Sequence, residues 1–329
     1  MNAILLTGAG FSHNWGGRLA REINTAVAIR LQNDAPLADL LHRNPNFEEA
    51  LTELQNEVAT SARPGTAERL QKLESAIVDA FAVMNRNLGA ASFNFSNDLK
   101  YSLPQFLVLF DAIFTLNQDL LLEKHYLYPS QIIALTGTRR WLRGCLPGID
   151  EIPNPAQSGL YDPLLAQWRP QPSPTTTAID PQSQPYVKLH GSMNWTDPTG
   201  GRLLVMGGNK PTTMRRHPIL TWYAAKFLEP LSKPGARLMV IGYGFRDNHI
   251  NQLIYDAWQK SNRTLTMFIV HPDGREILKK VNATYGKPIY VPEPLEEIMA
   301  YDSTRSLHTT FGGNDPGEYD ILVEYAKGI

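Results

Sequence analysis

The sequence predicts an α/β fold in which helices cover both faces of a parallel sheet. Short apolar segments, many of them rich in β-branched residues, recur at long intervals along the chain. Most are followed by glycine or polar residues and then by a helical pattern, which is typical of strand–helix units around a buried parallel sheet. The expected strands cover residues 3–7, 112–116, 186–189, 238–241, 266–270 and 288–291.

A helical insertion separates the first two expected strands. More than a hundred residues lie between them, far beyond the length of an ordinary crossover. Residues 47–59 and 67–88 carry apolar side chains at i, i+3 and i+4 spacing, with good helix formers between them. We therefore predict a helical subdomain at residues 40–105, inserted into an α/β domain that spans residues 1–329.

A second irregular tract covers residues 146–185 and is rich in Pro, Ser, Thr, Gln and Gly. Its prolines exclude a regular helix. A loop of this length is either a functional cover or a disordered segment. We expect a Pro-rich loop or partly mobile lid.

The composition favours an ordinary cytoplasmic enzyme. The 329-residue chain has a net charge of -1, so bulk electrostatics give no indication of a nucleic-acid or membrane-surface partner. Its single cysteine, Cys145, excludes an internal disulfide and a multi-cysteine metal site, and we expect no metal. The sequence has no signal-peptide pattern and no apolar stretch of the roughly 20 residues that a membrane span needs.

The first expected strand ends in a glycine-rich turn, and a helical pattern resumes from Leu19. Such an arrangement can bind phosphate, because glycines let the backbone approach closely and a helix N-terminus offers unpaired N–H groups. The dinucleotide fingerprint G-x-G-x-x-G fails here, since His13 occupies the third glycine position. A tight turn without a ligand is the alternative. The residues of the turn are Gly8, Ala9, Gly10, Phe11 and Ser12.

Polar residues and glycines follow four other expected strands, at the sheet edge where ligands bind in open α/β folds. Each segment also has a structural interpretation. Asn117 and Asp119 can cap a helix, His190 can be a hydrogen-bonded structural residue, and the glycines can form a turn. The segments are Thr115-Leu116-Asn117-Gln118-Asp119, Lys188-Leu189-His190-Gly191-Ser192, Gly242-Tyr243-Gly244-Phe245-Arg246-Asp247 and His271-Pro272-Asp273.

The order of these motifs resembles the sirtuin family, which has a Gly-Ala-Gly-x-Ser loop, a Thr-x-Asn-x-Asp motif, a His-Gly pair and a glycine-bearing strand end. The resemblance implies a Rossmann-like fold, NAD⁺ as the ligand, and Asn117 and His190 as the catalytic pair. Asp119 either supports its motif or caps the following helix, and Asp273 either accepts from a ribose hydroxyl or forms a turn. The cofactor-binding residues implied are Gly8, Ala9, Gly10, Phe11, Ser12, Thr115, Asp119, Gly242, Tyr243 and Asp273.

The departures from the protein-deacylating sirtuins point to another branch. Those enzymes hold a structural zinc with four cysteines, which this chain cannot do. The Trp15-Gly16-Gly17 segment and the stretch from Gly244 to Asn251 resemble the sirtuin-like NAD⁺-consuming effectors of bacterial anti-phage systems. This resemblance implies an NAD⁺ glycohydrolase (a hydrolase, or NADase) that releases nicotinamide and ADP-ribose and acts in antiviral defence by abortive infection. It further implies a homo-oligomer, a regulatory partner such as a HerA-type ATPase or a short Argonaute, or both.

The residue chemistry fits this reaction. Nicotinamide leaves as an already activated pyridine, so the enzyme has to hold the ribose and deliver a nucleophile rather than protonate the leaving group. Asn117 can donate to a ribose hydroxyl and accept from a water, and His190 can act as a general base. Two alternatives stay open: a sirtuin-type deacylase or ADP-ribosyltransferase, and a non-catalytic module that senses NAD⁺ or ADP-ribose.

Overall fold

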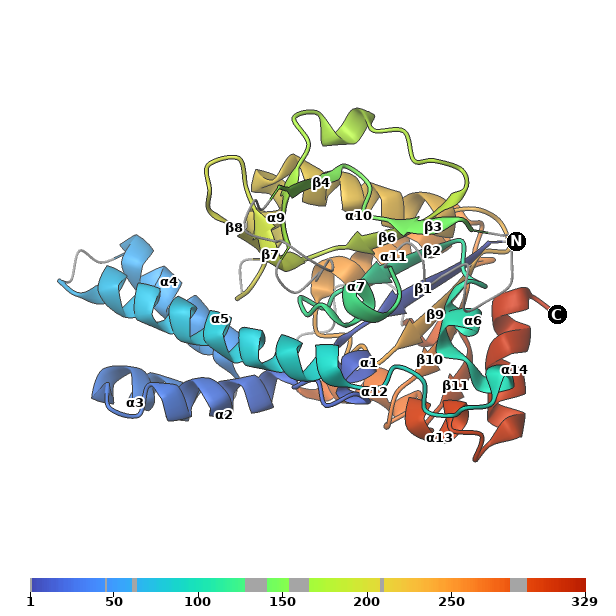
Figure 1. Ribbon diagram of the computed structural model, residues 1–329, viewed down its shortest axis with the longest axis horizontal. Coiled ribbons are helices and arrows are strands. Elements are labelled where there is room, and N and C mark those ends of the chain that lie inside the picture. Colours follow the sequence, from blue (N-terminus) through green and yellow to red (C-terminus); the bar gives the residue numbers. More distant parts are fainter. Residues whose placement is uncertain are drawn as a thin grey trace.

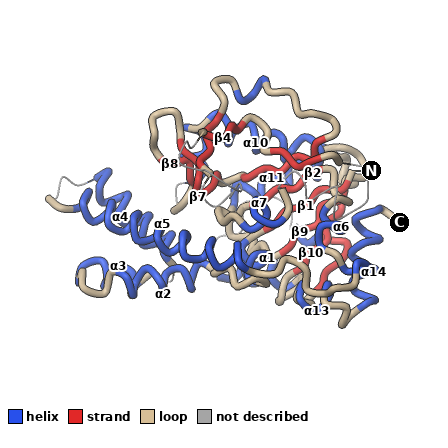
Figure 2. The backbone as a smooth tube through the Cα atoms, viewed as in Figure 1, coloured by secondary structure: helices blue, strands red, loops and turns tan. Residues whose placement is uncertain are grey.

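The structure is a computed structural model that describes residues 2–44, 46–60, 64–127, 141–153, 166–207, 210–284 and 295–329. Its centre is a seven-stranded sheet in the order β11-β10-β9-β1-β2-β6-β3, in which every neighbouring pair is parallel. Helices pack on both faces (Figures 1 and 2). The predicted α/β, Rossmann-like fold is therefore confirmed. The strands are β1 (Ala3–Thr7), β2 (Ala112–Thr115), β3 (Arg143–Cys145), β6 (Ser183–Lys188), β9 (Arg237–Ile241), β10 (Thr266–Val270) and β11 (Met299–Ser303).

Five of the expected strands correspond to β1, β2, β6, β9 and β10. The sixth, at residues 288–291, lies outside the described residues. The two edge strands, β3 and β11, were not predicted. Both include exposed residues, and neither has the apolar run of a strand that is buried on both faces.

The register of the sheet brings several strand ends to one edge. Thr7 of β1 pairs with Thr115 of β2 and with Ile241 of β9, and Thr115 pairs in turn with Lys188 of β6. Val270, at the end of β10, pairs with Ile241. The loops that follow these five strands therefore all begin at the carboxyl edge of the sheet.

Alternate residues of the central strands enter two separate cores. On β1, Leu5 packs with one cluster, which also contains the side chains of α5, α13 and α14. Ile4 and Leu6 pack with the other, which contains those of α10, α11 and α12. Both layers are needed because every residue of β1 is buried.

The helices are α1 (Ala9–His13), α2 (Ala20–Arg30), α3 (Ala35–Arg43), α4 (Phe47–Thr60), α5 (Thr66–Ala90), α6 (Leu103–Leu107), α7 (Leu121–His125), α9 (Lys210–Arg216), α10 (Pro218–Leu231), α11 (Asn248–Lys260), α12 (Glu276–Thr284), α13 (Leu307–Phe311) and α14 (Pro316–Lys327). Short 3-10 helices cover Leu99–Tyr101, Pro174–Thr176 and Leu295–Ile298. Among the described residues, no helix combines the length and apolar character that crossing a membrane requires.

Helices α2 to α5 form an arm that extends from the sheet (Figure 1). We call these four helices the helical arm. They pack on one another through buried apolar residues such as Val27, Leu51 and Leu73. The insertion expected at residues 40–105 thus includes α4 and α5, while the helices packed against them begin further upstream, at Ala20. The helical pattern expected from Leu19 corresponds to α2, which begins at Ala20 and buries Ile23 and Val27 against the arm.

A smaller four-stranded sheet, in the order β4-β5-β7-β8, lies beside the main sheet. The tract expected as a loop or lid at residues 146–185 contributes ordered strands to it, and residues 154–165 of that tract lie outside the described residues. Prolines are compatible with these strands because they stand at strand ends, as Pro170 does in β5. The strands are β4 (Ile149–Ile152), β5 (Gln167–Pro170), β7 (Gly191–Thr196) and β8 (Arg202–Leu204).

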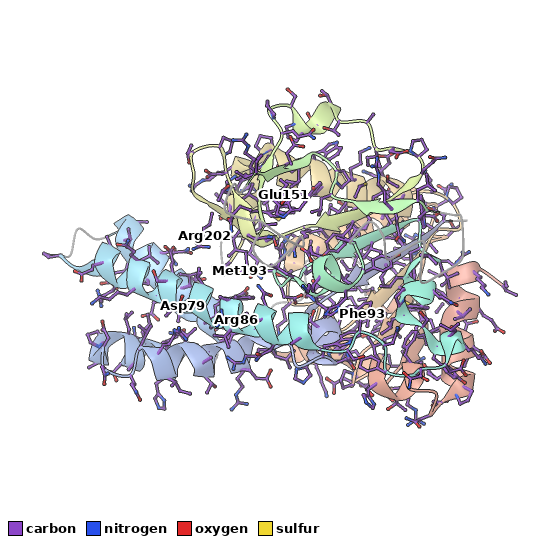
Figure 3. The ribbon with its side chains drawn as sticks, in the orientation of Figure 1. Asp79, Arg86, Phe93, Glu151, Met193 and Arg202 are labelled. Carbon is purple, nitrogen blue, oxygen red and sulfur yellow. The ribbon has the colours of Figure 1, made fainter. Side chains whose placement is uncertain are left out.

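The small sheet faces the helical arm. Burial raises the pKa of Glu74 on α5, and the positive charge of Arg202 on β8 opposes that shift. In Figure 3, Arg202 lies over the arm, where Asp79 and Arg86 of α5 are labelled. The arm is thus in electrostatic contact with the body of the protein at β8.

Candidate active site

The glycine turn packs directly against the end of β9. The N–H of Gly8 donates to the carbonyl of Ile241, and that of Gly10 to the carbonyl of Gly242, each at 2.9 Å. A Cβ atom on Gly8 would lie 2.6 Å from the Gly242 oxygen and 2.7 Å from the Cα of Tyr243. Gly242 itself has φ +66°, which favours glycine. The glycines are therefore required for two backbone segments to approach each other.

This packing changes the expected role of the turn. Because the Gly8 and Gly10 N–H groups already have acceptors in the protein, the tight-turn interpretation accounts for them without a phosphate. The ring of Phe11 is buried, and His13 Nδ1 lies 2.8 Å from the carbonyl oxygen of Gly17. Ala9 is exposed, whereas Ser12 is buried and its hydroxyl accepts from Asn117.

Asn117 faces this turn from the neighbouring strand β2. Its Nδ2 donates to Ser12 Oγ at 3.0 Å, and its N–H donates to Thr115 Oγ1 at 3.0 Å. Thr115 also accepts from the hydroxyl of Thr7 at 2.8 Å, so it joins β1 to β2 inside the protein. Within the described residues, Asn117 Oδ1 has no hydrogen-bond partner, which leaves one amide acceptor for a ligand.

Asp119 serves as a cap in this structure. Its Oδ1 accepts from the N–H of Leu121, the first residue of α7, at 3.1 Å. Its carbonyl oxygen accepts from Nζ of Lys188, which also lies 2.6 Å from Glu123 Oε1. The hydroxyl of Tyr186 donates to the other Glu123 oxygen at 3.1 Å. We call Lys188, Glu123 and Tyr186 the Lys188 cluster; it fixes the segment after β2 to the end of β6.

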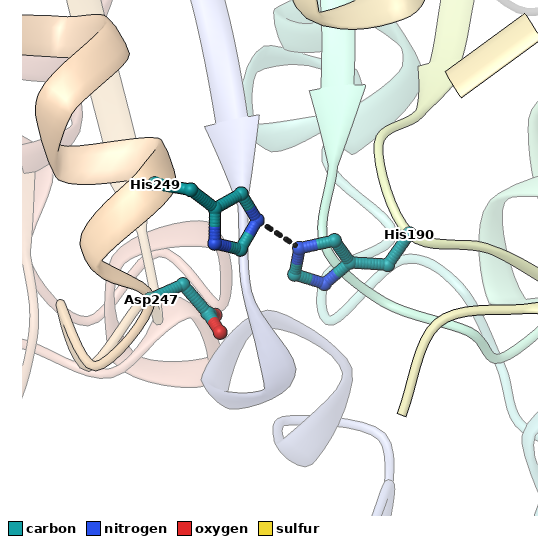
Figure 4. Close-up of side chains that lie close together, drawn as sticks. All are labelled: His190, Asp247 and His249. Atoms are coloured by element: carbon teal, nitrogen blue, oxygen red, sulfur yellow. Dashed lines mark hydrogen bonds between the residues drawn. The ribbon is translucent and has the colours of Figure 1, made fainter. Parts of the chain in front are cut away.

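His190 is buried and contacts a second histidine. Its Nε2 lies 2.9 Å from Nε2 of His249, close to the start of α11 (Figure 4). Burial lowers the pKa of His190 to about 3, and the negative charge of Asp247 opposes that shift. Burial likewise lowers the pKa of His249. Both imidazoles are therefore neutral at neutral pH.

A chain of charges continues from the histidine pair into the helical arm. Nζ of Lys210 on α9 lies 2.8 Å from Asp247 Oδ1 and 2.9 Å from Oε2 of Glu48 on α4. Burial opposes a charge on Asp247, but the neighbouring groups, foremost the Lys210 ammonium, outweigh that effect and lower the pKa of Asp247 to about 2. Asp247 is therefore ionised at neutral pH, held between a lysine and two imidazoles.

His190, Asp247 and His249 each offer a ligand atom, and these atoms lie within 4.8 Å of one another. This donor set has the chemistry of a metal site. The Asp247 carboxylate, however, is already neutralised by the Lys210 ammonium group, and that positive charge repels a cation. The arrangement therefore fits the ion pair better than a metal ion.

The remaining expected binding residues have structural partners. Tyr243 is buried, and its hydroxyl donates to Asn251 Oδ1 at 3.0 Å, so it holds the first turn of α11 instead of presenting its ring to a ligand. Asp273 forms an ion pair with Lys280, and its N–H donates to Nδ1 of His271 at 3.1 Å. These contacts favour the turn interpretation of Asp273.

Lys210 and Glu48 were not identified from the sequence as part of the site. The sequence also did not predict that Asp247 and His249 would lie beside His190. The Asp-x-His spacing after β9 was a local signal, because it places both side chains at the start of a helix beside a strand end. Lys210 and Glu48 had no such signal, since they come from helices far apart in the chain.

The fold and the site define an α/β protein with a polar centre at the carboxyl edge of its parallel sheet. Residues 111–289, more than half of the chain, match the SIR2-like domain family. The chain therefore belongs to the SIR2-like family, whose domains are often NAD-utilising enzymes. The matched range includes Asn117, His190, Asp247 and His249. A comparison with curated proteins gives no match.

Proposed function

We propose that this protein is an NAD⁺ glycohydrolase that cleaves NAD⁺ into nicotinamide and ADP-ribose. The observation that carries the proposal is the placement of Asn117 and His190 at the carboxyl ends of the adjacent parallel strands β2 and β6. In open α/β sheets this edge is where ligands bind. Membership of the SIR2-like family is consistent with NAD⁺ as the substrate.

The residues supply the groups that this hydrolysis needs. Asn117 keeps its Oδ1 available among the described residues and holds Ser12 through its Nδ2, so it can orient a ribose hydroxyl or the attacking water. His190 is neutral and can accept a proton from that water. Because nicotinamide departs as a neutral molecule from a cationic pyridinium, no general acid is required.

The biological role belongs to the same proposal. The segments Trp15-Gly16-Gly17 and Gly244 to Asn251 support a cytoplasmic effector of an abortive-infection, anti-phage system that stays inactive until triggered. Its expected partners are further copies of this chain, a HerA-type ATPase or a short Argonaute. The net charge of -1 gives no support for direct nucleic-acid binding.

The test is nicotinamide release by the purified protein, alone and together with the protein encoded beside it. Asn117→Ala and His190→Ala should each reduce release by at least about 10²-fold, the lower end of a general base's contribution. Matched controls are the exposed residues of the helical arm, in Asn56→Ala and His42→Ala. Activity that survives both site variants would refute the assignment. Faster acyl transfer than hydrolysis would favour the deacylase, and tight binding without turnover would favour the sensing module.

A further inference from the structure

The hydrogen bond between His190 and His249 contains one proton and therefore has a direction. The two Nε2 atoms lie 2.9 Å apart, and both rings are neutral because burial disfavours their charged forms. A neutral imidazole has one N–H and one lone pair. One Nε2 must therefore donate while the other accepts, and this choice fixes which nitrogen of each ring carries its proton.

Asp247 determines that direction. In Figure 4 its carboxylate lies below the ring of His249, on the side of the ring nitrogen that makes no dashed contact, Nδ1, and the ligand atoms of the three residues lie within 4.8 Å of one another. A negative charge at this place stabilises a proton on Nδ1 of His249. With Nδ1 protonated, Nε2 of His249 has the lone pair and accepts from Nε2–H of His190. The lone pair of His190 then lies on its Nδ1.

We propose that His249 is a positioning residue, which holds His190 in the tautomer with Nε2 protonated and Nδ1 as the basic nitrogen. This inference rests on the proposed function, in which His190 is the general base. In the reaction, Nδ1 takes the proton of water as the water oxygen bonds to the ribose carbon. The carbon–nitrogen bond breaks, and its electron pair leaves with nicotinamide. The imidazolium formed keeps its Nε2–H bond to His249, and the Asp247 charge stabilises it.

Lys210 fixes the carboxylate on which this selection depends. It bridges Asp247 to Glu48 of the helical arm at 2.8 and 2.9 Å. The charged groups that act on the histidine pair are thus Asp247, which precedes α11, and Lys210 of α9. Glu48 of α4 thus contacts the same ammonium group that neutralises Asp247.

Two amide substitutions at His249 distinguish a positioning role, which needs a hydrogen-bond acceptor at the place of Nε2, from a role in filling space. In His249→Gln, the side-chain oxygen can reach the place of Nε2 and accept from His190, whereas the shorter side chain of His249→Asn reaches only the place of Nδ1. We expect the Gln variant to keep kcat within about 10-fold of the unmodified protein, and the Asn variant to lose about 10²-fold. The KM for NAD⁺ should change little in either. Equal loss in both variants would overturn the proposal.

A second measurement does not depend on activity. Nitrogen-15 NMR of the labelled full chain at neutral pH should show a protonated Nε2 and a bare Nδ1 for His190, with the reverse for His249. The His249→Gln variant assigns the signals by deleting one ring. A His190 ring protonated at Nδ1 would overturn the proposal. An unmodified protein with the expected tautomer but no nicotinamide release would instead refute the proposed function.

Discussion

Two lysines, Lys188 and Lys210, lie near the same edge of the sheet and stabilise different parts of the protein. The side chain of Lys188 is 0% exposed and contacts Glu123 and a main-chain oxygen, all within the scaffold. The side chain of Lys210 is 13% exposed and bridges Asp247 to Glu48, groups from the histidine site and the helical arm. The same ion-pair chemistry thus fixes strand to helix in one place and joins the histidine site to the helical arm in the other.

The carboxylates show why the two pairs differ. Burial raises the pKa of Glu123 more strongly than Lys188 lowers it. At Asp247 the neighbouring groups, foremost Lys210, outweigh burial, and the pKa falls to about 2. A buried ion pair contributes little net stability when intact, but breaking it leaves an uncompensated charge. We infer from this comparison that Lys188 mainly stabilises the fold, whereas Lys210 mainly keeps the carboxylate of Asp247, next to His249, ionised.

The largest expected effect is on stability at the Lys188 cluster. Lys188→Met should lower the free energy of unfolding by about 3–5 kcal/mol, because Glu123 is left buried without its cation. Denaturant unfolding measures the loss. The double variant Lys188→Met with Glu123→Leu should recover most of it, since no isolated charge remains. A single variant as stable as the unmodified protein would show that the cluster does not hold the scaffold.

Lys210→Met should have a smaller effect on stability and a larger one on the reaction. We expect a loss of about 1.5–3 kcal/mol, the range for hydrogen bonds to charged groups, together with slower nicotinamide release per folded molecule. The control Lys226→Met breaks an exposed ion pair with Glu229 and should leave both quantities nearly unchanged. If release by the Lys210 variant equals that of the control, the contrast between the two lysines is wrong.

A substitution in the glycine turn tests whether close backbone packing against the end of β9 stabilises this part of the site. In Gly10→Ala, the new Cβ would lie 2.8 Å from the Cα of Gly242. We expect a cost of about 1–3 kcal/mol, as for other overpacked sites. Gly244→Ala is the matched control, because its Cβ would meet nothing within 4 Å. Thermal unfolding of the two variants should therefore differ clearly, and equal values would contradict the close packing.

The smallest expected effect, taken per pH unit, is the slope of the free energy of unfolding against pH. His190 has a folded pKa of about 3 against its ordinary 6.5, so between these values the unfolded chain binds more protons. The free energy of unfolding should fall on acidification by up to about 1.4 kcal/mol per pH unit from this residue. Asp247 acts in the same direction below pH 3.8, while the raised pKa of Glu123 acts in the opposite one.

Denaturant unfolding at several pH values measures this slope. His190→Gln should flatten it, because the side chain no longer titrates, while His42→Gln at an exposed position provides the comparison. A slope that is the same in both variants would show that the histidine pair does not stay neutral on acidification.

Much of the fold was predictable because a strand that is buried on both faces has a continuous run of apolar residues. Apolar runs such as residues 3–7 and 266–270 need no partner to be recognised as strands. The order of the motifs likewise predicted Asn117 and His190 as site residues, and the structure places them just after β2 and β6. The edge strand β11 has partly exposed residues and no continuous apolar run. The roles of Gly8 and Gly10 also depended on the position of β9, more than two hundred residues away in the chain.

The sequence by itself determined the parallel sheet, the helices of the arm from Phe47 onwards, and the residues at the strand ends, because hydrophobic periodicity and glycine act locally. Only the tertiary structure decided which strand-end residues face one another. It placed His249 against His190, and Lys210 between Asp247 and Glu48. Electrostatic interactions depend on distance in space and on burial, and neither follows from separation along the chain.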